Sequence, residues 1–242
     1  MKIIITAAGL GSRFSEIGIK NPKYKIIARE KSLYEWSMLS LKDFFEEEFI
    51  FIFRKDILDR TFIKNINNKL GIKNYSIIEI DNLTDGQATT AFLANEYISD
   101  EDEVIIYNID TYVEPYEIIK DDIKSHMIGF IPVIEAEGDR WSFIKVNDRM
   151  HVIEVAEKRP ISNLATIGFY YFRQWKQYKA IYLNNKYNII KNNKEFYIAP
   201  MYEYLMDKGV LGTKILNSNK VYILGTPEEI QVFDNNYLDK NK

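Results

Sequence analysis

Hydrophobic residues form short runs in the first half of the chain, separated by segments with helical spacing. The apolar runs predict strands at residues 2–8, 49–53, 75–80 and 104–107. Apolar positions three and four residues apart predict helices at residues 32–45, 56–70 and 86–98. Strands that alternate with helices in this way favour a parallel sheet with helices on both faces.

The second half of the chain has a different pattern, with strand-like segments that follow one another closely. These segments cover residues 126–134, 141–146, 152–156 and 166–172. They predict an antiparallel extension of the sheet. Helices are expected at residues 174–190, 199–208 and 227–235, with short strands near 211 and 221. Pro227 suits the first position of the last helix, and the final lysines and asparagines are expected to fray.

Composition excludes several classes of site. The chain of 242 residues has no cysteine, so disulfides, Cys-ligated zinc, iron–sulfur clusters and thiolate nucleophiles are ruled out. Its two histidines, His126 and His151, are too few for a histidine metal cluster. A Ser-His-Asp triad is formally possible, but the G-x-S-x-G elbow that would carry its nucleophile does not occur. A net charge of -3 predicts no general attraction to nucleic acid or anionic membrane. Without a signal peptide pattern or an apolar run of about 18 residues, we expect a cytoplasmic protein.

The first predicted strand ends in a glycine-rich loop with the sequence A-A-G-L-G-S-R, residues 7–13. Paired glycines let backbone amides approach an anion closely, although a tight turn without a ligand would use them too. Phe14 stands where the third glycine of a dinucleotide fingerprint belongs, and the P-loop pattern is missing. Arg13 and Lys23, the latter in an N-P-K segment, can neutralise a polyphosphate. The loop therefore predicts a phosphate site.

Five motifs in order resemble the signature of the nucleotidyltransferase family, which includes sugar-nucleotide pyrophosphorylases and small-molecule cytidylyltransferases. They are A-A-G-L-G-S-R with N-P-K, D-G-Q-A-T at 85–89, N-I-D at 108–110, E-K at 157–158 with A-T-I-G-F at 165–169, and G-T-P-E at 225–228. The resemblance covers nearly the whole chain. It implies one Rossmann-like α/β nucleotidyltransferase domain over residues 1–242, with a mixed, mostly parallel central sheet. It also implies an enzyme that joins a nucleoside triphosphate to a phosphorylated acceptor and releases pyrophosphate.

The resemblance also implies a role for each matching residue. The catalytic residues are expected to be Arg13, Lys23 and Lys158. The nucleotide-binding residues are expected to be Ala7, Ala8, Gly9, Gly11, Ser12, Gly86, Gln87 and Asn108. The acceptor-binding residues are expected to be Glu157, Lys158, Gly168, Trp141 and Tyr197. Asp110 is expected to hold Mg²⁺, while Ile223 occupies a position at which many relatives carry a second metal-binding Asp.

The substrates are less closely defined by the sequence. The chain looks most similar to short bacterial cytidylyltransferases, and this implies CTP with phosphoglutamine as the acceptor, in capsule phosphoramidate biosynthesis. Arg140 or Arg159 would then meet the acceptor carboxylate. A sugar 1-phosphate enzyme and a phosphocholine cytidylyltransferase, with Trp141 and Tyr197 around the quaternary amine, are the alternatives. Gln87 does not separate cytosine from uracil, because an amide both donates and accepts.

Two other classes of protein remain open at this point. An NAD-type oxidoreductase is disfavoured by Phe14, and a non-catalytic nucleotide sensor would bind nucleotide without turning it over. The sequence predicts no nucleic-acid or membrane partner. It leaves the oligomeric state open, a homo-oligomer included.

Overall fold

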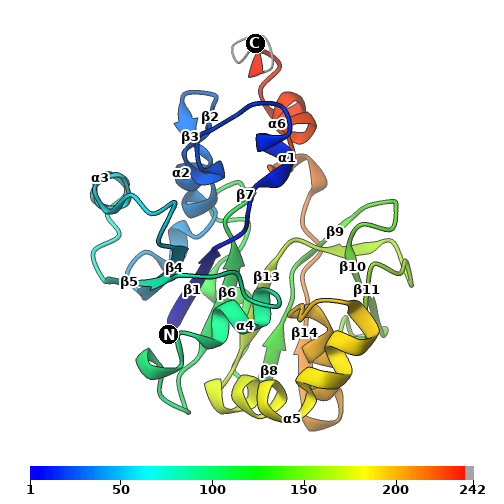
Figure 1. The fold of residues 1–242 in the computed structure, drawn as a ribbon. Helices are drawn as coiled ribbons and strands as arrows, with labels where there is room; N and C mark the ends of the chain where they lie inside the picture. Colours follow the sequence, from blue (N-terminus) through cyan, green and yellow to red (C-terminus); the bar gives the residue numbers. More distant parts are fainter. Residues whose placement is uncertain (238–242) are drawn as a thin grey trace.

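The computed structural model describes residues 1–237, so Lys240–Lys242, which were expected to fray, lie outside the described residues. A seven-stranded sheet in the order β14-β8-β13-β6-β1-β4-β5 forms its centre (Figure 1). Its strands are β1 (Lys2–Ala7), β4 (Glu48–Arg54), β5 (Tyr75–Ile80), β6 (Val104–Asn108), β8 (Met127–Phe130), β13 (Phe169–Phe172) and β14 (Val210–Gly212). Only β13 runs antiparallel to its neighbours in this sheet. The predicted mixed, mostly parallel sheet is confirmed.

The antiparallel strands predicted for the second half are also present, but most of them form a separate sheet. This four-stranded sheet has the order β11-β10-β12-β9. Its strands are β9 (Val133–Glu135), β10 (Ser142–Val146), β11 (Val152–Glu157) and β12 (Leu164–Thr166). The predicted strands 126–134 and 166–172 are each divided between the two sheets. Pro132, which lacks a backbone N–H, interrupts the first, and Gly168, with φ +80°, turns the chain in the second.

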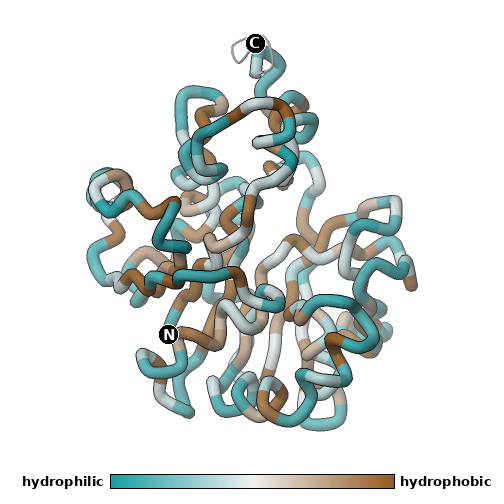
Figure 2. The backbone as a smooth tube through the Cα atoms, in the orientation of Figure 1, coloured by the Kyte–Doolittle hydropathy of each residue, from teal (hydrophilic) through white to brown (hydrophobic). Residues whose placement is uncertain are grey.

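Helices cover both faces of the central sheet, as predicted. The α-helices are α1 (Ser12–Ser15), α2 (Leu33–Leu39), α3 (Arg60–Leu70), α4 (Gln87–Phe92), α5 (Trp175–Asn193) and α6 (Pro227–Phe233). On one face Ile4 packs with residues of α4 and α5, and on the other Ile3 and Ile5 pack with residues of α2 and α3. This division follows from the alternation of side chains along a strand. Figure 2 shows the hydrophobic stretches along the central strands and hydrophilic segments at the periphery.

Several predicted helices have different limits in the structure. The segment 32–45 begins as expected after Ser32, whose Oγ accepts from the N–H of Glu35 at 3.1 Å, but α2 ends at Leu39. The segment 56–70 begins only after Asp59 and ends, as predicted, at Gly71 with φ 85°. The segment 86–98 keeps α-helical geometry only to Phe92.

The predicted helix 199–208 is wrong as an α-helix, because this segment consists of two 3₁₀ turns. Met201, Tyr202 and Leu205 are fully buried there, so tertiary packing fixes the segment rather than helix propensity. The 3₁₀ turns of the chain are η1 (Lys23–Lys25), η2 (Lys42–Phe44), η3 (Asn95–Tyr97), η4 (Lys120–Asp122), η5 (Ala199–Tyr204), η6 (Met206–Lys208) and η7 (Ser218–Lys220).

A small third core, which the sequence did not predict, supports the glycine-rich loop. It joins α1 and α6, which lie near the top of Figure 1, to two two-stranded ribbons. The ribbons are β2 (Ile27–Ala28) with β3 (Lys31–Ser32), and β7 (Thr111–Val113) with β15 (Val221–Ile223). Phe14, the residue that breaks the dinucleotide fingerprint, is buried in this core and anchors the end of the loop.

None of the helices within residues 1–237 combines the length and the apolar character that a bilayer crossing requires.

Candidate active site

Two adjoining cavities open at the carboxyl ends of β1 and β6, the edge of a parallel sheet where ligands commonly bind. The larger has a volume of about 640 Å³ and the smaller about 320 Å³. Both are lined by the same six residues where they meet, which are Arg13, Gln87, Asn108, Asp110, Glu195 and Gly225. The two cavities therefore form one cleft with two compartments.

The glycine-rich loop forms one wall of the larger cavity. All the residues expected to bind the nucleotide line this cavity, namely Ala7, Ala8, Gly9, Gly11, Ser12, Gly86, Gln87 and Asn108. Gly11 has φ +64°, a conformation that glycine adopts without strain. Nothing lies within 4 Å of the position that a Cβ would take on Gly9, so the loop backbone is open to a ligand there.

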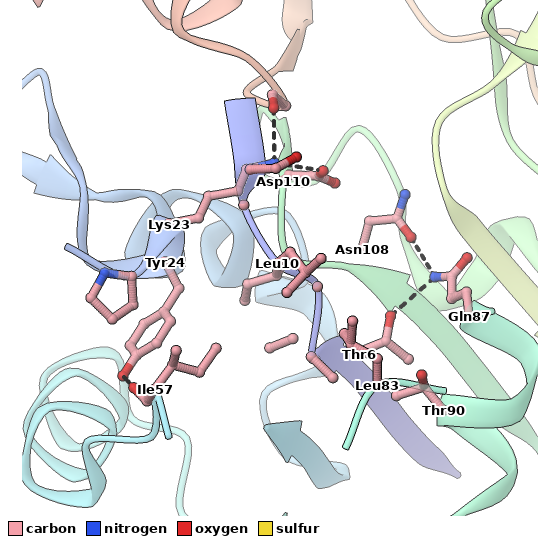
Figure 3. Close-up of a pocket in the computed structure, with 18 of the residues that line it drawn as sticks. Thr6, Leu10, Lys23, Tyr24, Ile57, Leu83, Gln87, Thr90, Asn108 and Asp110 are labelled. Atoms are coloured by element: carbon pink, nitrogen blue, oxygen red, sulfur yellow. Dashed lines mark hydrogen bonds and ion pairs between the residues drawn. The ribbon is translucent and has the colours of Figure 1, made fainter. Parts of the chain in front are cut away.

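Lys23 and Asp110 meet at the border between the compartments (Figure 3). The Nζ of Lys23 donates to Oδ2 of Asp110 at 2.8 Å and to the carbonyl oxygen of Gly225 at 3.2 Å. Two buried serines, Ser37 in α2 and Ser40 directly after it, hold the backbone around Asp110. Ser37 Oγ donates to the carbonyl oxygen of Asn108, and Ser40 Oγ accepts from the N–H of Val113, each at 2.9 Å.

Asp110 is held in its charged form. Burial of its carboxyl raises the pKa, but the charge and the hydrogen bond of Lys23, with the charge of Arg13, bring the pKa below its ordinary value. Arg13 itself is exposed at the cleft and makes no hydrogen bond or ion pair with residues 1–237 that would hold its guanidinium. Its five donors are therefore available to an anionic ligand.

Gln87 and Asn108 connect the two compartments. The Nε2 of Gln87 donates to Oγ1 of Thr6 at 3.1 Å and to Oδ1 of Asn108 (Figure 3). Both amide hydrogens are thus used inside the protein, and Oε1 of Gln87 is left to accept from a ligand. Asn108 in turn packs against Gly168, where an added Cβ would lie 2.0 Å from Nδ2 of Asn108. Only glycine fits at position 168.

The smaller cavity contains most of the residues expected to bind the acceptor. Glu157, Gly168, Trp141 and Tyr197 line it. Ser142 Oγ donates to the carboxyl of Glu157. Burial raises the pKa of Glu157 above its ordinary value, and the Ser142 hydrogen bond and nearby Lys158 only partly oppose this.

Lys158 differs from the expected arrangement, because it does not line either cavity. Its Nζ donates to Oη of Tyr197 at 2.6 Å, at the rim of the smaller cavity. This hydrogen bond raises the pKa of Lys158, so its ammonium is firmly charged. Its backbone has φ +52°, which strains a residue with a side chain and is a common feature of functional sites.

An ion pair between two residues that line the smaller cavity was not predicted from the sequence. The guanidinium of Arg140, on the loop before β10, binds the carboxylate of Glu229 on α6 and lies 4.5 Å from the centre of the Trp141 ring. Both partners line the cavity, whereas Arg159 points to Glu154 at 3.7 Å and does not. The only signal for Glu229 is its place three residues after Thr226, whose Oγ1 accepts from its N–H at 3.2 Å.

Divalent metal binding is compatible with these side chains, but only with help from a substrate. Within residues 1–237, no three carboxylate or imidazole side chains converge as a protein metal cluster would require. Asp110 contributes one charged oxygen donor beside the glycine-rich loop, and Ile223 contributes none. Such a site fits Mg²⁺, which is commonly bound by one or two carboxylates together with phosphate oxygens and water.

Comparison with known proteins places the chain in a family. A scan against protein-family models found no match, and neither did a search of curated proteins. A nucleoside-diphosphate-sugar pyrophosphorylase from Vibrio cholerae has a similar structure, with a TM-score of 0.85 and 31% identity, over 96% of this chain and 99% of that one. The chain belongs to the nucleotidyltransferase family. It is accordingly a nucleotidyltransferase enzyme, as the five motifs implied.

More distant nucleotidyltransferases share the fold. An inositol-1-phosphate CTP transferase from T. maritima has a TM-score of 0.75 and 16% identity, over 94% of this chain and 90% of that one. A UDP-glucose pyrophosphorylase complexed with UDP-glucose has a TM-score of 0.75 and 17% identity, over 99% of this chain and 98% of that one. These two similarities support the nucleotidyltransferase fold of the chain and say nothing of its substrates.

Proposed function

We propose that this nucleotidyltransferase transfers CMP from CTP to a small phosphorylated acceptor, phosphoglutamine, and releases pyrophosphate, a reaction that would serve capsule phosphoramidate biosynthesis. The observation that carries the proposal is the cleft with two compartments. A larger cavity beside a glycine-rich loop suits a nucleoside triphosphate, and a smaller one of about 320 Å³ suits a compact acceptor. Arg13 and Asp110, which line both compartments, would then lie beside the reacting phosphates.

The chemistry needs no general base from the protein. A phosphate group carries nearly two negative charges at neutral pH, so one of its oxygens can attack the α-phosphorus of CTP directly. The new P–O bond forms as the bond to the bridging oxygen breaks, and pyrophosphate leaves with the electron pair. Catalysis then consists mainly of positioning and charge neutralisation. Arg13 and Lys23 would stabilise the triphosphate and the leaving group, and Lys158 would swing from Tyr197 to the acceptor phosphate.

Asp110 would hold Mg²⁺ together with the triphosphate oxygens. When bound, the cation would neutralise charge on the phosphates and fix their orientation. Lys23, which is paired with Asp110 in the structure at 2.8 Å, would be released to the phosphates as the nucleotide arrives.

Gln87 is compatible with CTP but does not select it over UTP. Because both hydrogens of its amide bond to Thr6 and Asn108, its oxygen can only accept, and the exocyclic amino group of cytosine is a suitable donor. The N3–H of uracil would also suit this oxygen. The resemblance of the sequence motifs to short bacterial cytidylyltransferases favours cytosine.

The charges around the smaller cavity favour an acceptor with both an acidic and a basic group. Arg140 could bind a carboxylate and Glu157 an ammonium, as phosphoglutamine would require. A quaternary amine is less suitable, because the rings of Trp141 and Tyr197 already contact cationic side chains of the protein. Arg140 covers Trp141, and the Lys158 ammonium lies on Tyr197. Phosphocholine would meet like charge at both rings.

A sugar 1-phosphate is the second candidate acceptor, since the relative with 31% identity is a nucleoside-diphosphate-sugar pyrophosphorylase. Measurement of pyrophosphate release decides between the two. CTP, UTP, GTP, ATP and dTTP are each combined with Mg²⁺ and with phosphoglutamine, phosphocholine, phosphoethanolamine or hexose 1-phosphates. Release with CTP and phosphoglutamine alone supports the proposal. Release with a hexose 1-phosphate overturns the acceptor, and nucleotide binding without any release indicates a sensor.

Replacement of Arg140 with alanine should weaken acceptor binding. We expect the acceptor KM to rise about 10-fold and the affinity for CTP to stay within a factor of two, because Arg140 lines only the smaller cavity. Steady-state kinetics and nucleotide titration measure the two effects. Arg159→Ala is the matched control, since Arg159 is exposed and lines neither cavity. Unchanged acceptor kinetics in Arg140→Ala would exclude this residue from recognition.

Replacement of Glu157 with glutamine should lower the affinity for the acceptor and raise the stability of the fold at neutral pH. The folded protein raises the pKa of Glu157, so its contribution to stability is present below the ordinary pKa of 4.5 and is lost as pH rises through the folded value. We therefore expect Glu157→Gln to have a higher Tm than wild type at pH 7.5, and the difference to shrink toward pH 5. The acceptor KM should rise about 10-fold, because a charged hydrogen-bond acceptor is lost.

Thermal denaturation at both pH values and kinetics at pH 7.5 test this expectation. Ser142→Ala is a useful comparison, since it removes the hydrogen bond to Glu157 but keeps the carboxyl. A variant that is less stable than wild type at pH 7.5 would show that the carboxylate stabilises the fold, contrary to the expectation.

A further inference from the structure

Arg54 lies directly behind the glycine-rich loop and was given no role by the sequence. It is the last residue of β4, which pairs in parallel with β1 up to Ala7 and Phe53. Ala8, the first residue after β1, and Arg54 are therefore neighbours where the loop begins. Arg54 is only 8% exposed, and a buried arginine requires partners for its charge.

The guanidinium of Arg54 joins the loop to the carboxylate of Asp56. Its Nη1 donates to the carbonyl oxygen of Gly9 at 3.2 Å and to that of Ala8 at 3.4 Å. Its Nε and Nη2 donate to the two carboxylate oxygens of Asp56, at 2.9 and 2.7 Å. This bidentate ion pair fixes the plane of the guanidinium, so Nη1 is held toward the loop.

The direction of these carbonyl groups determines the direction of the loop amides. A trans peptide is planar, with its C=O and N–H pointing in opposite directions. The carbonyls of Ala8 and Gly9 point to Arg54, so the N–H groups of Gly9 and Leu10 point away from it. Ala8, Gly9 and Leu10 line the larger cavity and Arg54 does not. Arg54 therefore contacts the loop on the side opposite the surface that lines the cavity.

We propose that Arg54 is a positioning residue for nucleotide binding, which holds the loop so that the amides of Gly9 and Leu10 are available to the phosphates of the bound nucleotide. The inference rests on the proposed function only in that the larger cavity takes a nucleoside triphosphate. It adds a determinant of nucleotide affinity that does not touch the nucleotide. Without Arg54, two carbonyl groups lose their donor, and the peptide planes are free to rotate toward the cavity and present oxygens to the phosphates.

A purely structural arginine would have different consequences. If Arg54 only stabilised the end of β4, its loss would lower the Tm and would affect both substrates alike. If it orients the loop, its loss should weaken the nucleotide and leave the acceptor unaffected, because the smaller cavity contains none of residues 8–10. The separation of the two substrates is therefore the decisive observation.

The experiment compares Arg54→Met, Arg54→Lys and Asp56→Asn in the full chain. Calorimetric titration with CTP, and with the other nucleoside triphosphates, gives nucleotide affinity without any acceptor. We expect Arg54→Met to weaken binding of the preferred nucleotide at least 10-fold, with the acceptor KM within a factor of two. Arg54→Lys should recover part of the affinity, since an ammonium can still donate to one carbonyl. Asp56→Asn should have a smaller effect, because Arg54 keeps its loop contacts.

Backbone amide resonances provide a readout that does not depend on activity. On addition of nucleotide, the ¹⁵N–¹H signals of Gly9 and Leu10 should shift in the wild type and shift much less in Arg54→Met. Equal nucleotide affinity in Arg54→Met and wild type would overturn the inference, as would an equal loss for nucleotide and acceptor. If the wild type binds no nucleoside triphosphate, the proposed function fails instead.

Discussion

Replacement of Arg13 with methionine is expected to lower kcat about 100- to 1,000-fold, the usual cost of removing one donor that stabilises charge in a transition state. Arg13 is exposed and lines both compartments, beside Asp110 at their border. Because no described residue holds its guanidinium, the substitution should leave the Tm within about 1 °C of wild type, as is usual for exposed sites. Stopped-flow measurement of pyrophosphate release under single-turnover conditions gives the chemical step directly.

Two further variants make this test specific. Arg13→Lys keeps the charge but loses the planar fork, so it should recover only part of the rate. Lys20→Met removes a nearby exposed charge that lines neither cavity, and it should be close to wild type. If Arg13→Met had the kcat of wild type, Arg13 would have no part in stabilising the leaving pyrophosphate, and Lys23 alone would have to do so.

The location of the cleft could be predicted from local sequence. A strand that ends in A-A-G-L-G-S-R places glycines and Arg13 at the carboxyl edge of the sheet, and N-I-D places Asp110 at the end of a neighbouring parallel strand. Parallel pairing brings these ends together, so residues 100 apart along the chain share one cavity. Such information is contained in strand order and in the residue types at strand ends.

The supporting residues could not be predicted in the same way. Arg54 and Ser37 act on backbone atoms of other segments, at distances that depend on strand register and helix packing. A charged residue at the end of an otherwise hydrophobic strand was the only signal for Arg54. Likewise, the division of the second half between two sheets depends on Pro132 and Gly168, single residues inside patterns that were otherwise continuous. Periodicity predicts elements, but long-range packing decides which sheet they join.

Replacement of Asp110 with asparagine should have an equally large effect, through the metal. Asparagine keeps the size of the side chain and removes its charge, and a neutral amide is a weaker ligand for a hard divalent cation. We expect kcat to fall about 100- to 1,000-fold. The Mg²⁺ concentration that gives half-maximal activity should rise. Calorimetric titration with Mn²⁺ in the presence of nucleotide measures the binding of the cation independently of turnover.

The ion pair between Asp110 and Lys23 also allows the stability and the nucleotide affinity of Asp110→Asn to be predicted. The side chains of Lys23 and Asp110 are only 18% and 32% exposed, so loss of the carboxylate leaves a largely buried ammonium without its charged partner and should lower the Tm. In Asp110→Asn, Lys23 is no longer held by a carboxylate, and nucleotide alone should bind at least as tightly as to wild type. Glu16→Gln is the control, an exposed carboxylate directly after α1 that lines neither cavity.

Combination of Asp110→Asn with Lys23→Met then distinguishes a shared role from two separate ones. If both side chains act on the same phosphates, the double variant should lose much less than the product of the two single losses, because residues in contact are not independent. Strictly multiplicative losses would mean that Lys23 and Asp110 act on different steps. An unchanged Mg²⁺ dependence in Asp110→Asn would exclude Asp110 as a ligand of the metal. The position of this carboxylate beside the glycine-rich loop would then need another explanation.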